Sequence, residues 1–292
     1  MCLVLTTPGG NAIAETTVAP SGYLAVPGAR LYYEVAGTGP TLLMIHAGTG
    51  EADDWHRLRA HLTRSFRVVT YDRRGSSRSR LTKPAGWITI RRHAEDAAAL
   101  LKHVGGGPAH ALGSSGGGTV LLELTARHPE LLKTVVPHEP AVCEMGGAKE
   151  CARVRKVGKA ANAVYRITRN SDLAMLTFIA GTNDDDEVEP GAPPAPPLTP
   201  ERAARLKKND GFFLGHEIRE ILGYHIPLAK LRAVNSKIVP IHGKYAGKGM
   251  KREVHALTQA LGTKPPLTFP GGHTGYIIHP EKFATELHKT LH

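Results

Sequence analysis

The stretch AHALGSSGGGTVLLEL, residues 109–124, places two adjacent serines between glycines. The pattern Gly-x-Ser-x-Gly is typical of a sharp turn from a strand into a helix, where the serine is strained and exposed. The positions two before and two after that serine pass too close to other backbone for side chains. Centred on Ser115, those positions are Gly113 and Gly117, whereas centred on Ser114 the earlier one is a leucine. The stretch therefore predicts Ser115 as a nucleophile.

On both sides of this turn, short apolar runs alternate with amphipathic helical patterns. The first 18 residues of the pattern, 23–40, read as two alternating strands joined by a Pro-Gly turn. The apolar runs cover residues 41–48, 66–72, 109–113, 133–138, 237–243 and 267–269. The helical patterns cover residues 53–64, 89–104, 251–261 and 280–291 and a segment that begins at Gly116. Continuous apolar strands between helices indicate a buried parallel sheet, so we expect an α/β fold with a mostly parallel eight-stranded sheet flanked by helices.

The alternation stops at residue 141 and resumes at residue 233. The intervening segment, 141–232, contains helical patches and an acidic, proline-rich stretch at 183–200 that we expect to be a mobile surface loop. We therefore predict an inserted helical lid at 141–232, a core formed by residues 23–140 and 233–292, and an N-terminal tail at residues 1–22.

Composition and charge narrow the class of protein. The 292 residues are 41% hydrophobic and 22% charged, which is typical of a soluble globular protein, and no apolar run reaches the roughly 20 residues of a membrane span. The net charge of +11 is scattered and lacks the aromatic-interleaved basic stripe that binds single-stranded nucleic acid. Cys2, Cys143 and Cys151 have no metal-ligand spacing and provide no disulfide framework. We expect no metal, no nucleic-acid partner and a reducing, cytoplasmic location, while a homodimer stays open.

Four motifs in chain order resemble those of the α/β-hydrolase superfamily. They are HAGTG at 46–50, YDRRGSSRS at 71–79, GSSGGG at 113–118 and PGGHTGYIIHPEKFA at 270–284. The resemblance covers nearly the whole chain apart from the tail and the insertion. It implies a serine hydrolase without a cofactor that cleaves an ester or lactone, with the chain order serine, acid, histidine.

The base and the acid are chosen by position. His273 follows the last strand in a Gly-Gly-His loop, where the superfamily places its catalytic imidazole, whereas His279 precedes a proline at a helix start and is interpreted as structural. The acid commonly follows the seventh strand, but Ala246 stands there, and no carboxylate occurs from residue 236 to 252. Glu139 follows the sixth strand, where lactonases that resemble the zearalenone-hydrolysing enzymes carry their acid. We therefore predict Glu139 as the acid, with its neighbour His138 as an alternative catalytic residue.

The remaining candidates surround the serine. The resemblance implies an oxyanion hole formed by the backbone N–H groups of Gly116 and Gly48, with Ala47 beside the substrate. His46, Asp72, Arg73 and Arg74 are interpreted as loop supports. Trp55 and Trp87 would line a pocket or simply pack. In the lid we expect Tyr165, Phe178, Phe212 and Phe213 to contact an apolar, uncharged, ring-containing substrate, or else to form the lid's own small core.

Other functions remain open on the same residues. Acyl transfer or perhydrolysis would use the same serine, and a non-catalytic small-molecule receptor would use the same fold. A haloalkane dehalogenase or epoxide hydrolase is disfavoured, since those relatives carry Asp where this chain has Ser115. The fold by itself does not identify the substrate.

Overall fold

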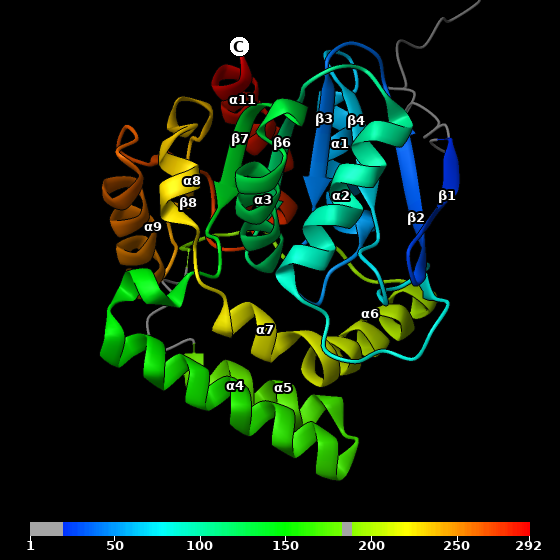
Figure 1. Ribbon diagram of the computed structural model, residues 1–292, viewed down its shortest axis with the longest axis vertical. Coiled ribbons are helices and arrows are strands. Elements are labelled where there is room, and N and C mark those ends of the chain that lie inside the picture. Colours follow the sequence, from blue (N-terminus) through cyan, green and yellow to red (C-terminus); the bar gives the residue numbers. More distant parts are fainter. Residues whose placement is uncertain (1–19, 183–188) are drawn as a thin grey trace, which may run out of the picture.

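The computed structural model describes residues 20–182 and 189–292, and its centre is a nine-stranded sheet (Figure 1). The strands are β1 Ser21–Val26, β2 Ala29–Ala36, β3 Thr41–Ile45, β4 Arg67–Tyr71, β5 Arg80–Leu81, β6 Ala109–Ser114, β7 Leu132–His138, β8 Ile241–Gly243 and β9 Leu267–Phe269. Their order is β1-β2-β4-β3-β6-β7-β8-β9, with β5 paired to β2. β2 pairs antiparallel with β1, β4 and β5. The pairs along the order β4-β3-β6-β7-β8-β9 are all parallel.

The predicted α/β sheet is confirmed, with two differences. The two-residue strand β5 is a ninth strand, because it is too short to give a periodic pattern. The core begins at Ser21 in β1, inside the tail predicted for residues 1–22; residues 1–19 of that tail lie outside the described residues.

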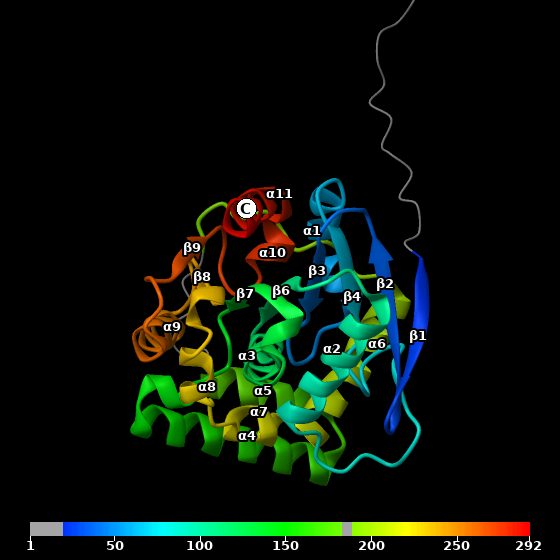
Figure 2. The same cartoon turned by 45° about the horizontal axis from the view of Figure 1, so that its top comes forward.

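Helices cover both faces of the sheet (Figures 1 and 2). One face packs against α1 His56–Leu62, which follows the 3-10 turn η1 Ala52–Trp55, and against α10 Gly275–Ile278 and α11 Pro280–Leu291. The other face packs against α2 Ile90–Val104, α3 Gly116–Arg127, α8 Leu228–Arg232 and α9 Lys248–Leu261. The parallel strands lie between two apolar cores, which explains why β3 is buried at all five positions.

A helical cap, inserted in the chain between β7 and β8, lies below the sheet in the view of Figure 1. Its elements are the 3-10 turn η3 Cys143–Gly146, α4 Ala148–Thr168, α5 Ser171–Thr182, α6 Pro200–Phe212, the π-helical turn η4 Phe213–Glu217 and α7 Ile218–Gly223. They occupy the segment predicted as a lid, although α8 at its end packs on α3 of the core.

The acidic, proline-rich segment is described only in part, since residues 183–188 lie outside the described residues. Residues 189–199 form neither helix nor strand. Glu189 within them is held on the core, because its Oε2 lies 2.8 Å from Nε2 of His279. This contact agrees with a structural role for His279.

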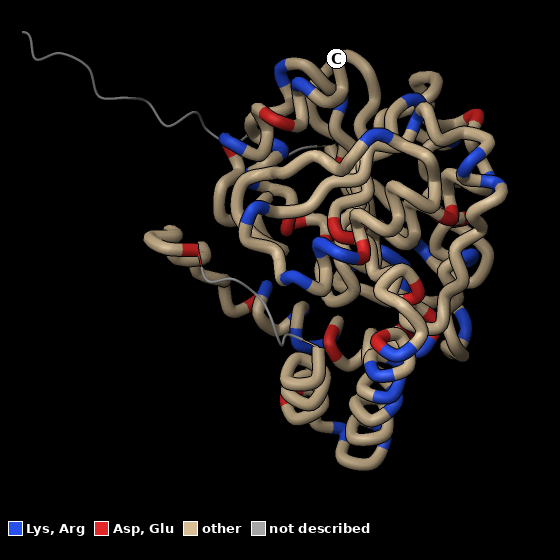
Figure 3. The backbone as a smooth tube through the Cα atoms, turned by 90° about the vertical axis from the view of Figure 1, so that its left-hand side faces the viewer, with Lys and Arg blue, Asp and Glu red and all other residues tan. Residues whose placement is uncertain are grey.

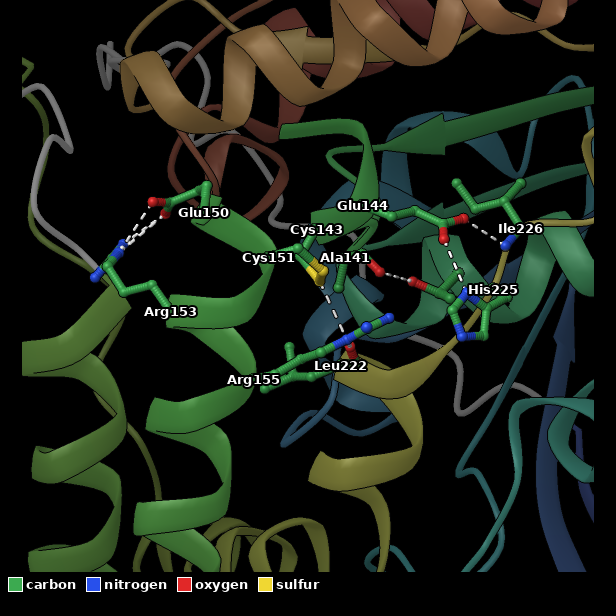
Figure 4. Close-up of a disulfide and its surroundings, with 11 residues drawn as sticks. Ala141, Cys143, Glu144, Glu150, Cys151, Arg153, Arg155, Leu222, His225 and Ile226 are labelled. Atoms are coloured by element: carbon green, nitrogen blue, oxygen red, sulfur yellow. Dashed lines mark hydrogen bonds and ion pairs between the residues drawn. A yellow bond between two sulfur atoms is a disulfide. The ribbon is translucent and has the colours of Figure 1, made fainter. Parts of the chain in front are cut away.

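The cysteines and the charges also bear on the expectations. Cys143 and Cys151 form a disulfide, with Cα atoms 4.7 Å apart, because η3 and the first turn of α4 fold back on each other (Figure 4). This corrects the expectation of unpaired cysteines and removes the basis for a reducing compartment. Lys and Arg are spread over core and cap and gather along α4 (Figure 3). None of the helices in the described part of the chain is long and apolar enough to cross a membrane.

Candidate active site

Ser115 lies at a strained turn between β6 and α3. Its φ of 53° and ψ of −122° are rare for a residue with a side chain, and its N–H donates to the carbonyl of His138 over 2.9 Å. A Cβ on Gly113 would lie 2.4 Å from the carbonyl oxygen of Gly117, and one on Gly117 would lie 2.3 Å from two carbonyl oxygens at the end of β3. The two glycines of the motif therefore stand where no side chain fits.

Ser114 occupies a different environment. Its side chain is fully buried, and its Oγ lies 3.1 Å from Nδ1 of His138. Ser115, in contrast, is partly exposed and lines a cavity. Of the two serines, Ser115 is the one that lines this cavity.

Glu139 and His273 come together from loops after β7 and β9. Nδ1 of His273 lies 2.5 Å from Oε2 of Glu139, whose other oxygen accepts a 2.7 Å hydrogen bond from the N–H of Gly243 in β8. Glu139 is fully buried with a φ of 44°, whereas the His273 side chain is 36% exposed. The carboxylate thus has one oxygen fixed by the sheet and the other on the imidazole.

Electrostatics favour the ionised form of this carboxylate. Burial alone would raise the pKa of Glu139, but the charges and hydrogen bonds of His138 and His273 outweigh burial and hold that pKa well below its ordinary value. An ionised Glu139 accepts the Nδ1–H of His273, so Nε2 is the ring nitrogen that carries no hydrogen in this tautomer.

His138 lies behind the carboxylate. It is fully buried between Ser114 and Glu139, with its Nε2 3.5 Å from Oε1 of Glu139. His138 is not among the residues that line the cavity at Ser115, so the structure favours His273 over it as the base.

The candidate nucleophile, acid and base all line one cavity of about 300 Å³ between core and cap. Its apolar lining residues are Ala141, Val142, Val154, Phe178, Leu222 and Met250, and its charged ones are Glu150, Arg153, Arg252 and Glu253. Phe178 is thus the predicted lid aromatic that lines the cavity. The charged residues were missed, because a periodic pattern on α4 or α9 does not tell which face meets the serine.

The two tryptophans are placed away from this cavity. Trp55 is fully buried in the core against Tyr276, with ring centroids 4.4 Å apart. Trp87 is 38% exposed and lies under the guanidinium of Arg219. The predicted substrate contact of Trp55 is therefore replaced by core packing, since Trp55 ends the η1 turn, whose last residue points into the core.

The other lid aromatics pack within the cap and against the core. Tyr165 contacts the glycines of the α6–η4 segment, and Phe212 covers Gly75. Phe213 is buried between Phe178, with ring centroids 5.8 Å apart, and Gly48. Tyr165, Phe212 and Phe213 are absent from the cavity lining, which agrees with the alternative that they form the lid's own core.

Gly48 and Gly116 face each other beside Ser115. A Cβ built on Gly116 would lie 3.5 Å from the backbone nitrogen of Gly48. Within the described residues, neither of these two N–H groups has a hydrogen-bond acceptor. Two backbone donors are therefore available at the serine, as an oxyanion hole requires. Ala47 precedes Gly48, and its carbonyl is engaged inside the loop.

The comparisons with known proteins agree with this arrangement. The family model described as the alpha/beta hydrolase fold matches residues 40–161. The chain is 33% identical over 281 residues to the uncharacterized hydrolase YraK of Bacillus subtilis, covering 93% of this chain and 96% of that one. It is 25% identical over 273 residues to the zearalenone hydrolase of Cladophialophora bantiana, covering 90% and 93%.

A solved structure extends the likeness to three dimensions. A hydrolase from Pseudomonas aeruginosa superposes with a TM-score of 0.73 at 21% identity, over 95% of this chain and 99% of that chain. Together with the sheet order and the strained serine turn, these matches place the chain in a family. The chain is a hydrolase that belongs to the α/β-hydrolase superfamily.

Proposed function

We propose that this hydrolase cleaves a carboxylic ester or lactone, with Ser115 as nucleophile, His273 as base and Glu139 as the acid that orients the base. The observation that carries the proposal is the fully buried Glu139 bound to His273, on the same cavity as a serine held at positive φ. A serine hydroxyl becomes nucleophilic when such a base takes its proton.

The reaction follows from these positions. His273 takes the Ser115 proton as Oγ attacks the carbonyl carbon, and the N–H groups of Gly116 and Gly48 bind the oxyanion that forms. His273 then gives the proton to the leaving alkoxide, and an ester joins the acyl group to Ser115. Water, activated by the same imidazole, hydrolyses that ester and restores the serine.

The proposed substrate is a small molecule with an apolar body. Phe178, Leu222 and Met250 supply apolar surface to the cavity. The zearalenone hydrolase at 25% identity supports a lactone among the candidates. Arg252 and Glu253 also line the cavity. Because these side chains carry charge, the charge of the substrate is the first property to vary in an assay.

The test is a panel of aryl esters, lactones and thioesters, neutral and anionic, assayed with the wild type and with Ser115→Ala. We expect turnover and labelling by a fluorophosphonate probe in the wild type and neither in the variant. A wild type that binds panel members but is neither labelled nor active would support a small-molecule receptor instead.

A further inference from the structure

A buried arginine lies directly beneath the loop that presents Gly48. The Arg73 side chain is fully buried, and its Nη2 donates to the carbonyl of Gly48 over 2.7 Å and to that of Ala47 over 3.3 Å. The Arg73 backbone N–H donates to Nε2 of His46 over 2.9 Å. The side chain and the backbone N–H of Arg73 thus both donate hydrogen bonds to the loop at residues 46–48.

The carbonyl of Ala47 is the important acceptor, because it belongs to the same peptide group as the N–H of Gly48. It accepts from Arg73, from Nδ1 of His46 at 2.7 Å and from the N–H of Gly50 at 3.2 Å. Burial and the charge of Arg73 lower the pKa of His46 to about 3, so its imidazole is neutral. Since Nε2 of His46 accepts, Nδ1 carries the proton and donates. Three donors on one carbonyl fix the peptide plane and polarise its N–H outward.

The charge of Arg73 is balanced by a carboxylate from the cap. Oε2 of Glu217 lies 3.0 Å from Nη2 of Arg73, and Oε1 lies 3.2 Å from Nη1 and 2.7 Å from Nε2 of His93. Glu217 is 1% exposed. Burial raises the pKa of Glu217, but the charges of Arg73 and His93 outweigh burial and lower that pKa to about 2. Glu217 is therefore an ion held inside the protein by this contact.

Glu217 ends η4, a π-helical turn between α6 and α7. Such turns are rare and are frequently found at functional sites. Two residues that precede Glu217 in the cap contact the loop that contains Gly48. The ring of Phe213 lies so close to Gly48 that a Cβ there would be 2.7 Å from it, and Nδ2 of Asn209 donates to the carbonyl of Gly50 over 2.9 Å. Asn209 and Phe213 of the cap therefore both contact the loop at residues 46–50, which we call the oxyanion loop.

We propose that Arg73 is a positioning residue of the oxyanion hole. In this proposal Glu217 of the cap holds the Arg73 guanidinium against the carbonyl of Ala47 and thereby fixes the orientation of the Gly48 N–H. The cap then has a catalytic consequence besides covering the substrate: when it is docked, Gly48 presents an aligned donor, and when it lifts, Arg73 loses its anion. This inference rests on the proposed function, because an oxyanion forms only if Ser115 attacks a carbonyl.

The experiment compares two buried ion pairs that start from adjacent residues. Glu217→Gln removes the anion that holds Arg73, and the double variant Arg73→Met with Glu217→Gln removes the whole ion pair. The matched control is Arg74→Met with Asp96→Asn, since Arg74 is 4% exposed, makes two 2.6 Å hydrogen bonds to Asp96, and otherwise contacts Pro27. The guanidinium of Arg74 donates to Asp96 and to the carbonyl of Pro27, whereas that of Arg73 donates to Ala47, Gly48 and Glu217, so the control removes a buried ion pair of a different loop.

The readouts are kcat and KM on an aryl ester, the Ki of phenylboronic acid and the melting temperature. Phenylboronic acid forms a tetrahedral adduct with a reactive serine and so requires the oxyanion donors. We expect both Glu217 variants to lose about 10- to 100-fold in kcat and a similar factor in phenylboronate affinity with little change in KM, a fraction of the loss caused by removing an oxyanion donor outright. Of two further single variants, Arg73→Lys keeps the positive charge and should therefore lose less kcat than Arg73→Met.

The control variant Arg74→Met with Asp96→Asn should lower the melting temperature as much as the double variant of Arg73 and Glu217 does. Its kcat per folded molecule should stay near that of the wild type. Unchanged kcat and phenylboronate affinity in folded Glu217→Gln and in the double variant would overturn the inference and leave the proposed function standing. Equal losses of kcat in the Arg74 control would also overturn it, by assigning the effect to general destabilisation. An unreactive wild type would overturn the proposed function and the inference with it.

Discussion

Replacing Glu139 by Gln tests the proposed acid with the smallest change of shape. The two oxygens of Glu139 accept from two different donors, the N–H of Gly243 at 2.7 Å and Nδ1 of His273 at 2.5 Å. A glutamine has one oxygen and one NH₂ group, so it can satisfy only one of these donors. The structure therefore allows two orientations of the amide, and each has a defined penalty.

If the amide oxygen faces Gly243, the NH₂ group donates to Nδ1 of His273 and the imidazole proton moves to Nε2. That tautomer cannot accept the Ser115 proton, and a comparable loss of tautomer in another serine hydrolase costs about 10⁴ in kcat. If the oxygen faces His273, the buried N–H of Gly243 loses its acceptor, which costs about 1–3 kcal/mol, or roughly 5- to 150-fold in the population of that orientation. We expect kcat to fall by about 10²–10⁴.

The assay is kcat/KM on an aryl ester together with a thermal melt. Asp96→Asn is the control, since Asp96 is a buried carboxylate that forms an ion pair with Arg74 and does not belong to the lining of this cavity. Glu139→Asp adds a second test, because the shorter side chain cannot reach both Gly243 and His273. Full activity in a folded Glu139→Gln variant would refute the reasoning and place the acid elsewhere.

The remaining predictions concern the serine turn and one carboxyl of the cavity. Ser115→Ala should abolish fluorophosphonate labelling and lower kcat by several orders of magnitude, whereas Ser114→Ala, which loses a buried contact to His138, should mainly lower the melting temperature; equal losses of kcat would contradict the register. Gly117→Ala should be severely destabilised, because its Cβ would lie 2.3 Å from two carbonyl oxygens; a normal melting temperature would show that the turn can relax.

Glu253→Gln should also stabilise the protein at pH 8 but not at pH 4. Burial and Glu150 raise the pKa of Glu253 from 4.5 to about 7, so the folded protein keeps a proton that the unfolded chain loses as the pH rises through this window, and stability falls there. We expect a gain of about 1 kcal/mol in unfolding free energy at pH 8 after allowance for partial exposure, and an equal gain at pH 4 would contradict this origin.

The sequence predicted those parts of the site that depend on backbone geometry. Gly113 and Gly117 mark a turn that no side chain can enter, so the register of Ser115 is readable from spacing alone. Glu139 was predicted from the resemblance to the superfamily, whose members with an acid after the sixth strand match this chain, since Ala246 occupies the usual acid position. Both predictions concern residues at strand ends, where chain order and sheet order determine which loops meet.

The parts that depend on side-chain packing could not be predicted. The sequence left open whether Trp55 lines a pocket or packs, and the structure places it in the core, because the η1 turn directs its ring toward Tyr276. Arg73 looked like a simple loop support, and its partner Glu217 is 144 residues away in a segment without strand or heptad periodicity. A buried ion pair between two irregular segments leaves no pattern in either of them. The contact between cap and loop is therefore visible only in three dimensions.

The use of a glutamate at this position follows from the order of the strands. β7 lies between β6, which ends before Ser115, and β8, so an acid after β7 starts one strand nearer to the nucleophile than an acid after β8. To reach His273, which follows β9, its carboxylate must extend over the end of β8. Glu139 does so with one oxygen on the N–H of Gly243, the last residue of β8, and the other on His273. The extra methylene of Glu relative to Asp supplies this reach, and β8 supplies the anchor that fixes it. With Glu139 as the proposed acid, the carboxylate comes from the strand next to the nucleophile strand and still meets the imidazole that follows β9.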